Sequence, residues 1–391
     1  MKKNDIQVGY ILSSPSSRNK GIAKHNLQCI VNSHLNKNIW YLTEINNIPS
    51  NLHAAVLFNS KKPLKIIKLA IPKLKCSQVL VKVLYSGICR SQIMEIDGLR
   101  GKDQWLPHML GHEASGIVVD IGKKVKKIKK NDEVILTWIK CNGQEAKTTP
   151  NFNFNKTKIN AGHVTTLSNY TIVSENRLVK KPRGLDIKVA SLFGCALPTG
   201  SGMVIKELKP RTNSVVAVIG LGGIGLSALA MLSNFKLKQI IAIDIAEDKL
   251  KFAKKLGANK IINLSKNSSR RIIENLKNKG VDYCIEAAGL VQTIELGFSI
   301  IKSQGGRLIF ASHPENGKKI SLDPFEFING KKIEGSWGGA IEPDSDFKKI
   351  YSIINKNKLP INKMITKTYN LDKVNEAVDD LKNGLVFRPI I

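Results

Sequence analysis

Acidic residues are scarce in this chain of 391 residues: 31 Asp and Glu stand against 61 Lys and Arg, a formal net charge of +30 at pH 7. Arginine is scarce too, because only 10 of those 61 cations are Arg. Nucleic-acid surfaces usually cluster their cations and use Arg for bidentate contacts. We therefore interpret the lysine excess, which is spread over the whole chain, as compositional. A basic protein that binds RNA or an anionic surface is kept as the distant alternative.

Cysteines and long apolar runs are also few. Six scattered cysteines do not form a disulfide framework, and Lys2 and Lys3 are followed by polar residues rather than by the apolar run of a signal peptide. These absences predict a cytoplasmic protein, since the cytosol keeps thiols reduced. The long uncharged stretch at residues 212–235 contains four glycines, so it does not fit a membrane span.

The remaining composition is that of a folded protein, with 42% apolar and 24% charged residues. The length allows two to three domains. Alternating apolar residues predict a β-rich first half, with strands at residues 53–58, 64–69, 78–85, 116–121, 133–138 and 169–173. Beyond about residue 197, predicted strands alternate with predicted helices. This alternation indicates βαβ units, and hence an α/β fold with a doubly wound parallel sheet.

The clearest local signal is the sequence Gly220-Leu-Gly222-Gly-Ile-Gly225, which lies between a predicted strand and a predicted helix. In that context it predicts a dinucleotide-binding turn. Gly220 permits the tight turn, Gly222 permits approach to a pyrophosphate, and Gly225 lets the helix pack closely on the strand. Asp244 ends the next predicted strand. Its carboxylate would accept hydrogen bonds from ribose hydroxyls and repel a 2′-phosphate, which favours NAD over NADP.

Three candidate metal ligands come from separate motifs. Cys89 lies in Gly-Ile-Cys-Arg-Ser, His112 in Gly-His-Glu, and Cys195 in Gly-Cys-Ala-Leu-Pro-Thr-Gly. Two thiolates and one imidazole leave a fourth tetrahedral position open, which is the arrangement of a catalytic zinc site. Buried cysteines and core histidines are commoner than ligands, so the spacing alone does not establish the site.

Together, and in this order, the motifs resemble the zinc-dependent medium-chain alcohol dehydrogenases over about residues 53–391. The resemblance implies a Rossmann domain, which is the doubly wound parallel sheet, and a β-rich GroES-like catalytic domain. The divisions that it implies are an N-terminal extension at 1–52, the GroES-like domain at 53–196, the NAD-binding Rossmann domain at 197–338, and a C-terminal return to the catalytic domain at 339–391.

The resemblance also implies roles for single residues. Cys89, His112 and Cys195 match the ligands of one catalytic Zn²⁺. The catalytic residues that it implies are Ser91, which bonds the alcohol oxygen and starts proton release, Glu113 beside the metal, and Thr199 beside the nicotinamide. The residues that it implies for NAD binding are Arg90, Thr199, Gly220, Gly222, Gly223, Ile224, Gly225, Asp244, Lys249 and Arg388.

The implied reaction is hydride transfer between NAD and an alcohol, or its aldehyde or ketone. A polyol or sugar dehydrogenase of the same family is the main alternative, although polyol enzymes often carry glutamate where Cys195 stands. We expect Trp105 and Trp138 to lie near the substrate channel. The resemblance further implies a small-molecule substrate and a homo-oligomer (dimer or tetramer), with no dedicated nucleic acid and no membrane as partner.

The chain departs from the family pattern at three places. Residues 138–163 contain only Cys141, where many members carry four cysteines that hold a second zinc. Met94 replaces a histidine that extends the proton relay in some members, so the proton must leave by water or by the cofactor ribose. Gln92 replaces an acid that orients the zinc histidine. We expect its amide still to accept a hydrogen bond from His112, with weaker zinc retention.

Overall fold

The structure is a computed structural model that describes residues 48–266 and 269–391. The predicted N-terminal extension therefore lies outside the described residues, except for residues 48–52. The strands of the first half are β1 (Asn51–Leu57), β2 (Lys65–Ala70), β3 (Gln78–Ser86), β4 (His108–Met109), β5 (Glu113–Ile121), β6 (Glu133–Thr137), β7 (Asn151–Phe154), β8 (Thr157–Asn160), β9 (Tyr170–Ser174) and β10 (Leu178–Lys180).

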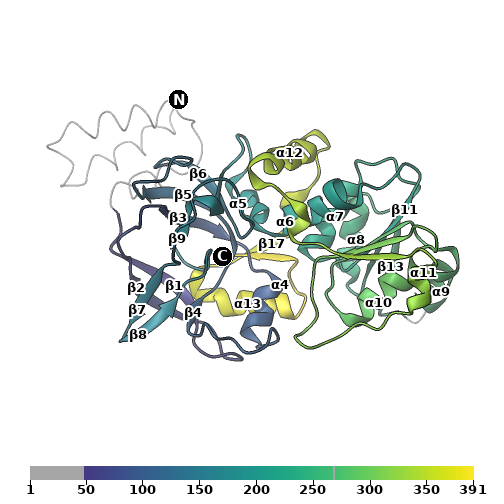
Figure 1. Cartoon of the computed structure of the whole chain (residues 1–391), viewed down its shortest axis with the longest axis horizontal. Coiled ribbons are helices and arrows are strands. Elements are labelled where there is room, and N and C mark those ends of the chain that lie inside the picture. The colour runs from purple at the N-terminus through teal and green to yellow at the C-terminus, as the bar shows by residue number, and fades with distance from the viewer. Residues whose placement is uncertain (1–47, 267–268) are drawn as a thin grey trace, which may run out of the picture. The chain divides into compact units, whose positions relative to one another are not determined.

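These strands form two five-stranded sheets, in the orders β2-β1-β4-β8-β7 and β10-β6-β5-β3-β9 (Figure 1). Strand β3 serves two cores because successive side chains point to opposite faces. Leu80 packs in one cluster with Leu52 and Val56, whereas Val79 and Val81 pack in another. The predicted β-rich first half is thus confirmed.

The second half contains a six-stranded parallel sheet (Figure 1). Its strands are β11 (Val215–Ile219), β12 (Gln239–Asp244), β13 (Lys260–Asn263), β14 (Tyr283–Glu286), β15 (Arg307–Phe310) and β16 (Lys332–Gly335). The order is β13-β12-β11-β14-β15-β16, so the strand order reverses at β11, and α/β folds place ligands at such a reversal. The predicted doubly wound sheet is confirmed.

Helices cover both faces of this sheet. The helices of the described chain are α4 (Arg90–Ile96), α5 (Ile187–Ala190), α6 (Ala196–Gly202), α7 (Gly223–Leu232), α8 (Glu247–Lys255), α9 (Ser269–Lys279), α10 (Val291–Ile300), α11 (Pro324–Ile328), α12 (Pro343–Lys356) and α13 (Val374–Lys382). In β11, Val216 and Val218 face a cluster that includes α7 and α8, whereas Ala217 and Ile219 face α9 and α10. Both faces of β11 are therefore buried, which explains its unbroken apolar run.

Short segments complete the described chain. They are the 3₁₀ turns Glu175–Arg177, Ser191–Gly194, Gly338–Ala340, Ile361–Met364 and Leu371–Lys373, and a π-helical stretch, Met203–Leu208.

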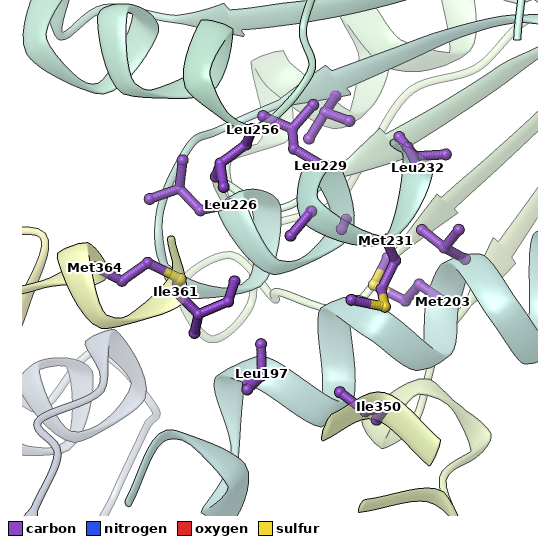
Figure 2. Close-up of a cluster of buried hydrophobic side chains, with 14 of the residues drawn as sticks. Leu197, Met203, Leu226, Leu229, Met231, Leu232, Leu256, Ile350, Ile361 and Met364 are labelled. Carbon is purple, nitrogen blue, oxygen red and sulfur yellow. The ribbon is translucent and has the colours of Figure 1, made fainter. Parts of the chain in front are cut away.

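The largest cluster of buried apolar side chains joins several of these helices and turns. Figure 2 shows Leu226 and Leu229 of α7 in the same cluster as Leu197 of α6 and Ile350 of α12. This packing fixes α6 and α7 against each other, and both begin at the candidate site.

The last residues of the chain pack against its first half. Strands β17 (Ile365–Thr368) and β18 (Arg388–Ile390) pair in parallel. Val374 and Val378 of α13 share a buried cluster with Leu57 of β1. Backbone hydrogen bonds of 2.8 and 2.9 Å join Ile391 to Ser86. This agrees with the expected C-terminal return, although the four domain boundaries stay a prediction.

The polar stretch at residues 143–162 contains the hairpin of β7 and β8, which composition did not predict. Two adjoining loops are held by the buried carboxylate of Glu175, which accepts backbone N–H bonds from Lys126 and Lys127 in one loop and from Gln144 in the other. These hydrogen bonds lower the pKa of Glu175 although burial opposes them. A carboxylate thus organises these two loops in this chain. Many family members carry four cysteines and a metal in the corresponding segment instead.

No single helix of the described residues is both long and apolar enough to cross a membrane; one pair, Ile187–Gly194 with Ala196–Leu208, reaches that length and composition only across a 60° bend.

Candidate metal centre and nucleotide turn

Three helix or strand starts bring the candidate metal ligands together. Cys89 is the N-cap of α4, His112 directly precedes β5, and Cys195 is the N-cap of α6. One ligand atom from each of the three side chains lies within 4.8 Å of the other two. Cys195 is buried, and the other two residues are half-buried. Residues that lie 106 positions apart in the chain, from 89 to 195, thus share one site.

The three groups are electrostatically coupled. The hydrogen bond from Cys195 and the hydrogen bond and charge of His112 hold the pKa of Cys89 well below its usual value, although burial opposes them. The hydrogen bond to Cys89 and burial raise the pKa of Cys195 well above its usual value. Burial alone would lower the pKa of His112, but the hydrogen bond and charge of Cys89 raise it. Without a metal, Cys89 is therefore the more acidic of the two thiols.

This donor set fits a zinc ion. Zinc binds cysteine sulfur at about 2.3 Å and histidine nitrogen at about 2.0–2.1 Å, so two ligands of one tetrahedral ion lie roughly 3.5–4 Å apart. The ligand atoms of Cys89, His112 and Cys195 lie within 4.8 Å of one another, so at most a small closure would bring them to that geometry. Two sulfurs and one nitrogen leave one position for a substrate oxygen, as catalytic zinc requires.

Gln92 does not make the contact that we expected. Its Oε1 accepts a 2.7 Å hydrogen bond from the backbone N–H of Cys89, and no hydrogen bond with His112 is found in the described residues. Its buried Nε2 has no partner there. The reason is local: α4 begins directly after Cys89, so Gln92 is at position N3 and its side chain folds back to the N-cap N–H, as in a capping box.

A buried ion pair lies behind the ligands. Arg388 donates from Nη2 to Glu113 Oε1, and the two side chains are 5% and 0% exposed. Burial raises the pKa of Glu113, although the charge of Arg388 opposes this. A Cβ on Gly87 would lie 2.0 Å from Glu113 Oε1, which explains the glycine two residues before Cys89. Nη1 of Arg388 lies 3.3 Å from the Cβ position of Gly223, so this arginine connects the metal centre to the start of α7.

The glycine turn has the geometry that its sequence predicted. Gly220 has φ +85°, a left-handed value that favours glycine. A Cβ on Gly225 would lie 1.9 Å from the carbonyl oxygen of Gly220, whereas nothing lies within 4 Å of the Cβ position of Gly222. The carboxylate of Asp244 accepts hydrogen bonds from the backbone N–H of Leu221 (2.6 Å) and of Ala246 (2.8 Å). Turn and acid are therefore adjacent.

The other predicted site residues surround these two centres. Ser91 is half-exposed on α4, and Arg90 is exposed beside it. Thr199 is buried, and its hydroxyl donates a 2.8 Å hydrogen bond to the carbonyl oxygen of Cys195. Ile224 and Lys249 are half-buried on α7 and α8. No side-chain hydrogen bond or ion pair joins these residues to one another in the described chain, and their roles stay predictions.

A cavity of about 590 Å³ lies beside His112 and is also lined by Trp105, one of the two predicted channel residues. Trp138 is not in its lining. Instead, the ring of Trp138 packs edge-to-face on Trp337, with 5.1 Å between the centroids. Trp138 follows β6, whose Thr137 pairs with Glu113, so this aromatic pair also lies near the metal centre. Trp337 was missed because it follows a strand, β16, that no sequence pattern indicated.

Glu286 is a second residue that motif analysis missed. It ends β14 and is fully buried. Its Oε1 accepts hydrogen bonds of 2.8 Å from the N–H groups of Ala288 and Gly289 and from the hydroxyl of Thr293. Burial raises the pKa of Glu286. The turn that it holds packs against Gly220, so Glu286 supports the nucleotide turn from beneath. The sequence signal that could have identified Glu286 is an acidic residue at the end of an otherwise apolar strand.

We expect Glu286→Leu to lower the free energy of unfolding by about 4 kcal/mol, because two buried backbone N–H groups lose their acceptor at one to a few kcal/mol each, whereas the Thr293 hydroxyl can still donate to the carbonyl oxygen of Leu290. Glu286→Gln keeps an acceptor at Oε1, so we expect a loss within about 1 kcal/mol. Urea unfolding followed by circular dichroism measures both. Equal losses in the two variants would contradict the hydrogen-bond explanation and favour side-chain shape.

Comparison with known proteins places this fold and site in a family. Residues 75–183 match the family model "Alcohol dehydrogenase GroES-like domain", and residues 223–356 match "Zinc-binding dehydrogenase". Alcohol dehydrogenase class-2 isozyme 2 of Oryctolagus cuniculus is 31% identical over 369 residues, which cover 86% of this chain and 97% of that protein. The chain therefore belongs to the zinc-dependent medium-chain alcohol dehydrogenase family, a family of oxidoreductases, as the motifs predicted.

Solved structures agree. An alcohol dehydrogenase zinc-binding domain protein from Burkholderia ambifaria has a TM-score of 0.78 and 25% identity, over 87% of this chain and 98% of its own. Benzyl alcohol dehydrogenase from Acinetobacter calcoaceticus has a TM-score of 0.77 and 26% identity, over 87% and 99%. The GroES-like and Rossmann-type fold is thereby confirmed, and none of these matches supports the RNA-binding alternative.

Proposed function

We propose that this chain is an NAD-linked alcohol dehydrogenase with one catalytic zinc ion held by Cys89, His112 and Cys195. The observation that carries the proposal is the spacing of these three side chains, whose ligand atoms lie within 4.8 Å of one another. The ion pair of Arg388 and Glu113 supports it, because it connects that cluster to the glycine turn. Family membership supplies the reaction class.

Each region of the site has a distinct task in this proposal. Zinc, when bound, would polarise the alcohol or carbonyl oxygen as a Lewis acid. The hydroxyl of Ser91 would take the proton of the alcohol, and Thr199 would pack beside the nicotinamide. The cofactor is held by the glycine turn and the start of α7, which favour a pyrophosphate, with Arg90, Lys249 and Arg388 as further cations. The protein thus supplies position and charge, while the cofactor takes the hydride.

The preference for NAD is proposed from Asp244. Its carboxylate lies at the turn, bonded to the N–H of Leu221, where a ribose 2′-hydroxyl would find an acceptor. A 2′-phosphate at the same place would meet its negative charge. We therefore propose NAD rather than NADP as the physiological cofactor.

The substrate is proposed only as a small alcohol or its carbonyl product. The related Acinetobacter protein is named a benzyl alcohol dehydrogenase, so aromatic primary alcohols belong in the test beside aliphatic, secondary and polyhydroxy alcohols. A polyol dehydrogenase is the second candidate, and the third ligand Cys195 argues against it. The four-part domain division, the homo-oligomer and the cytoplasmic location stay predictions.

The deciding experiment measures metal and cofactor on the purified full chain. We expect about one zinc per chain, saturable NADH binding with fluorescence transfer from tryptophan, and NAD reduction by at least one alcohol class. Zinc below one-tenth of the chain concentration after growth in zinc, together with no NADH binding, would overturn the proposal.

Zinc affinity should depend on pH. The pKa of Cys195 is raised by its hydrogen bond to Cys89 and by burial, and that of His112 is raised by Cys89 against its burial. A raised pKa favours the protonated form of each group, and zinc must displace those protons in order to bind. We therefore expect log Kd for zinc to rise by about one to two per unit fall in pH between about pH 8 and pH 6. Chelator competition measures this, and a flat profile would contradict it.

A further inference from the structure

Helix α4 presents one half-exposed face next to the metal centre. Ser91 and Glu95 lie on that face, four residues apart and hence one turn from each other. The intervening residues Gln92, Ile93 and Met94 are all buried. Side chains at this spacing have Cβ atoms about 5–6 Å apart, a distance that one water molecule bridges. The helix therefore aligns a hydroxyl and a carboxylate at its solvent-facing surface.

Glu95 faces the cavity beside the metal centre. It lines the cavity of about 590 Å³ that also contains His112 in its lining, and its charge acts on His112. The side chain is 29% exposed, and its oxygen lies 2.6 Å from Nη1 of Arg100. Glu95 is thus a partly exposed carboxylate of α4 in the lining of this cavity.

The other charged groups of this cavity do not offer the same path. The lining contains two carboxylates, Glu95 and Asp103. Like Glu95, Asp103 has a side-chain partner, since it is bonded at 2.8 Å to His108, and it also accepts the backbone N–H of Trp105; unlike Glu95, it lies outside α4. The remaining charged or titratable groups of the lining are Arg100, Lys102, His108, His112 and His163. Of all these residues, Glu95 alone shares a helix with Ser91.

Proton transfer away from Ser91 needs an acceptor. Met94, which lies beside Glu95 in the chain, is buried and has a thioether side chain that does not carry a proton at neutral pH. A carboxylate with access to solvent is a general base of the kind that proton relays use. Glu95 meets both requirements, because it is a carboxylate and its half-exposed side chain has access to solvent.

We propose that Glu95 is the proton-relay residue of this chain, an inference that rests on the proposed dehydrogenase function. During oxidation the C–H hydride goes to NAD⁺ and the O–H proton goes to Ser91. The proton of the Ser91 hydroxyl passes through one water to a Glu95 oxygen, and then from Glu95 to solvent in the cavity. The overall step is alcohol plus NAD⁺ to carbonyl, NADH and one proton. Carbonyl reduction uses the same path in reverse.

The test compares Glu95→Gln with wild type in the zinc-loaded full chain. In dilute buffer we expect kcat for alcohol oxidation to fall about tenfold, with KM for the alcohol nearly unchanged, because proton transfer and not binding is affected. Concentrated imidazole buffer should restore kcat, since a small base can enter the cavity and accept the proton. Glu95→Asp keeps a carboxylate and should retain most of the rate.

A measurement without turnover complements the kinetics. On mixing with NAD and trifluoroethanol, an alcohol that is not readily oxidised, release of the alcohol O–H proton is followed with a pH indicator in a stopped-flow instrument. We expect release to be slower in Glu95→Gln than in wild type, and imidazole to remove the difference. Equal release rates in the two proteins would overturn the proposal.

Asp97→Asn is the matched control. Asp97 is the C-cap of α4, is 31% exposed, and pairs with Lys382 at 2.6 Å, so it resembles Glu95 in burial and pairing but is not on the Ser91 face. We expect its kcat and imidazole dependence to equal those of wild type. Arg100→Gln breaks the same ion pair from the other side; if it lowers kcat as much as Glu95→Gln does, the pair is structural and the proposal fails. If the wild-type protein neither binds zinc nor oxidises any alcohol, that result instead refutes the dehydrogenase function.

Discussion

We expect the Cys89→Ser variant to lose its zinc and to lose kcat/KM for alcohol oxidation by about 1000-fold or more, since metal polarisation contributes several kcal/mol to such a transition state. Both of the other ligands, Cys195 and His112, are hydrogen-bonded to Cys89. The hydrogen bond from Cys195 and the hydrogen bond and charge of His112 hold the pKa of Cys89 low, against its burial. A serine hydroxyl does not ionise there near neutral pH, so the site would lose one of its two thiolate ligands.

Cys76→Ser controls for the chemical change. Cys76 is exposed and does not belong to the metal cluster, so the same sulfur-to-oxygen exchange should leave zinc content and rate unchanged. Zinc is measured by atomic emission on the purified proteins, and folding is checked by circular dichroism. Full zinc occupancy in a folded Cys89→Ser protein would show that other residues hold the ion.

The second large effect concerns the cofactor. We expect Asp244→Ser to lower kcat/KM for NAD by about 100-fold, because hydrogen bonds to a charged acceptor contribute about 1.5–3 kcal/mol each. The same change should raise kcat/KM for NADP, since the negative charge that would face a 2′-phosphate is gone. Serine still accepts one of the two backbone N–H bonds, from Leu221 or Ala246, that Asp244 accepts now. The turn itself should therefore persist.

Asp248→Ser tests whether any acid in this region would have the same effect. Asp248 lies in the first turn of α8 and is almost fully exposed, with only a 3.7 Å pairing to Lys251. Its loss should leave the NAD to NADP ratio within about twofold of wild type, as expected for an exposed pair worth well under 1 kcal/mol. An unchanged ratio in Asp244→Ser would contradict the assignment of the ribose site.

Sequence patterns predicted the parts of the site that depend on local geometry. Glycines at 220 and 225 are required by a left-handed turn and by a close helix contact, and both requirements are visible in the spacing of the motif. The ligands were predicted because three short motifs occur together. In contrast, the contact of Gln92 with Cys89 depends on which residue begins α4, and helix starts are uncertain by one or two residues from sequence.

Other features depend on long-range packing and carried no sequence signal. The strands of the hairpin at residues 151–160 are only four residues long and contain Asn and Lys, which are depleted in strands, so the short alternation of Asn and Phe in β7 was a weak signal. Trp138 and Trp337 meet from two different sheets, and only the folded chain shows the contact. The carboxylate of Glu175 acts on three backbone groups of two loops, which no motif encodes.

The ion pair of Glu113 and Arg388 joins residues 275 positions apart. During synthesis on the ribosome, all three sulfur and nitrogen donors would emerge long before their supporting guanidinium. In a nascent chain that has passed Cys195, burial of Glu113 beside the ligands would be energetically costly, because the cation that neutralises it has not yet been made. Stable metal acquisition should consequently be among the last events of maturation, and the time course of zinc uptake would report when the polypeptide has closed upon itself.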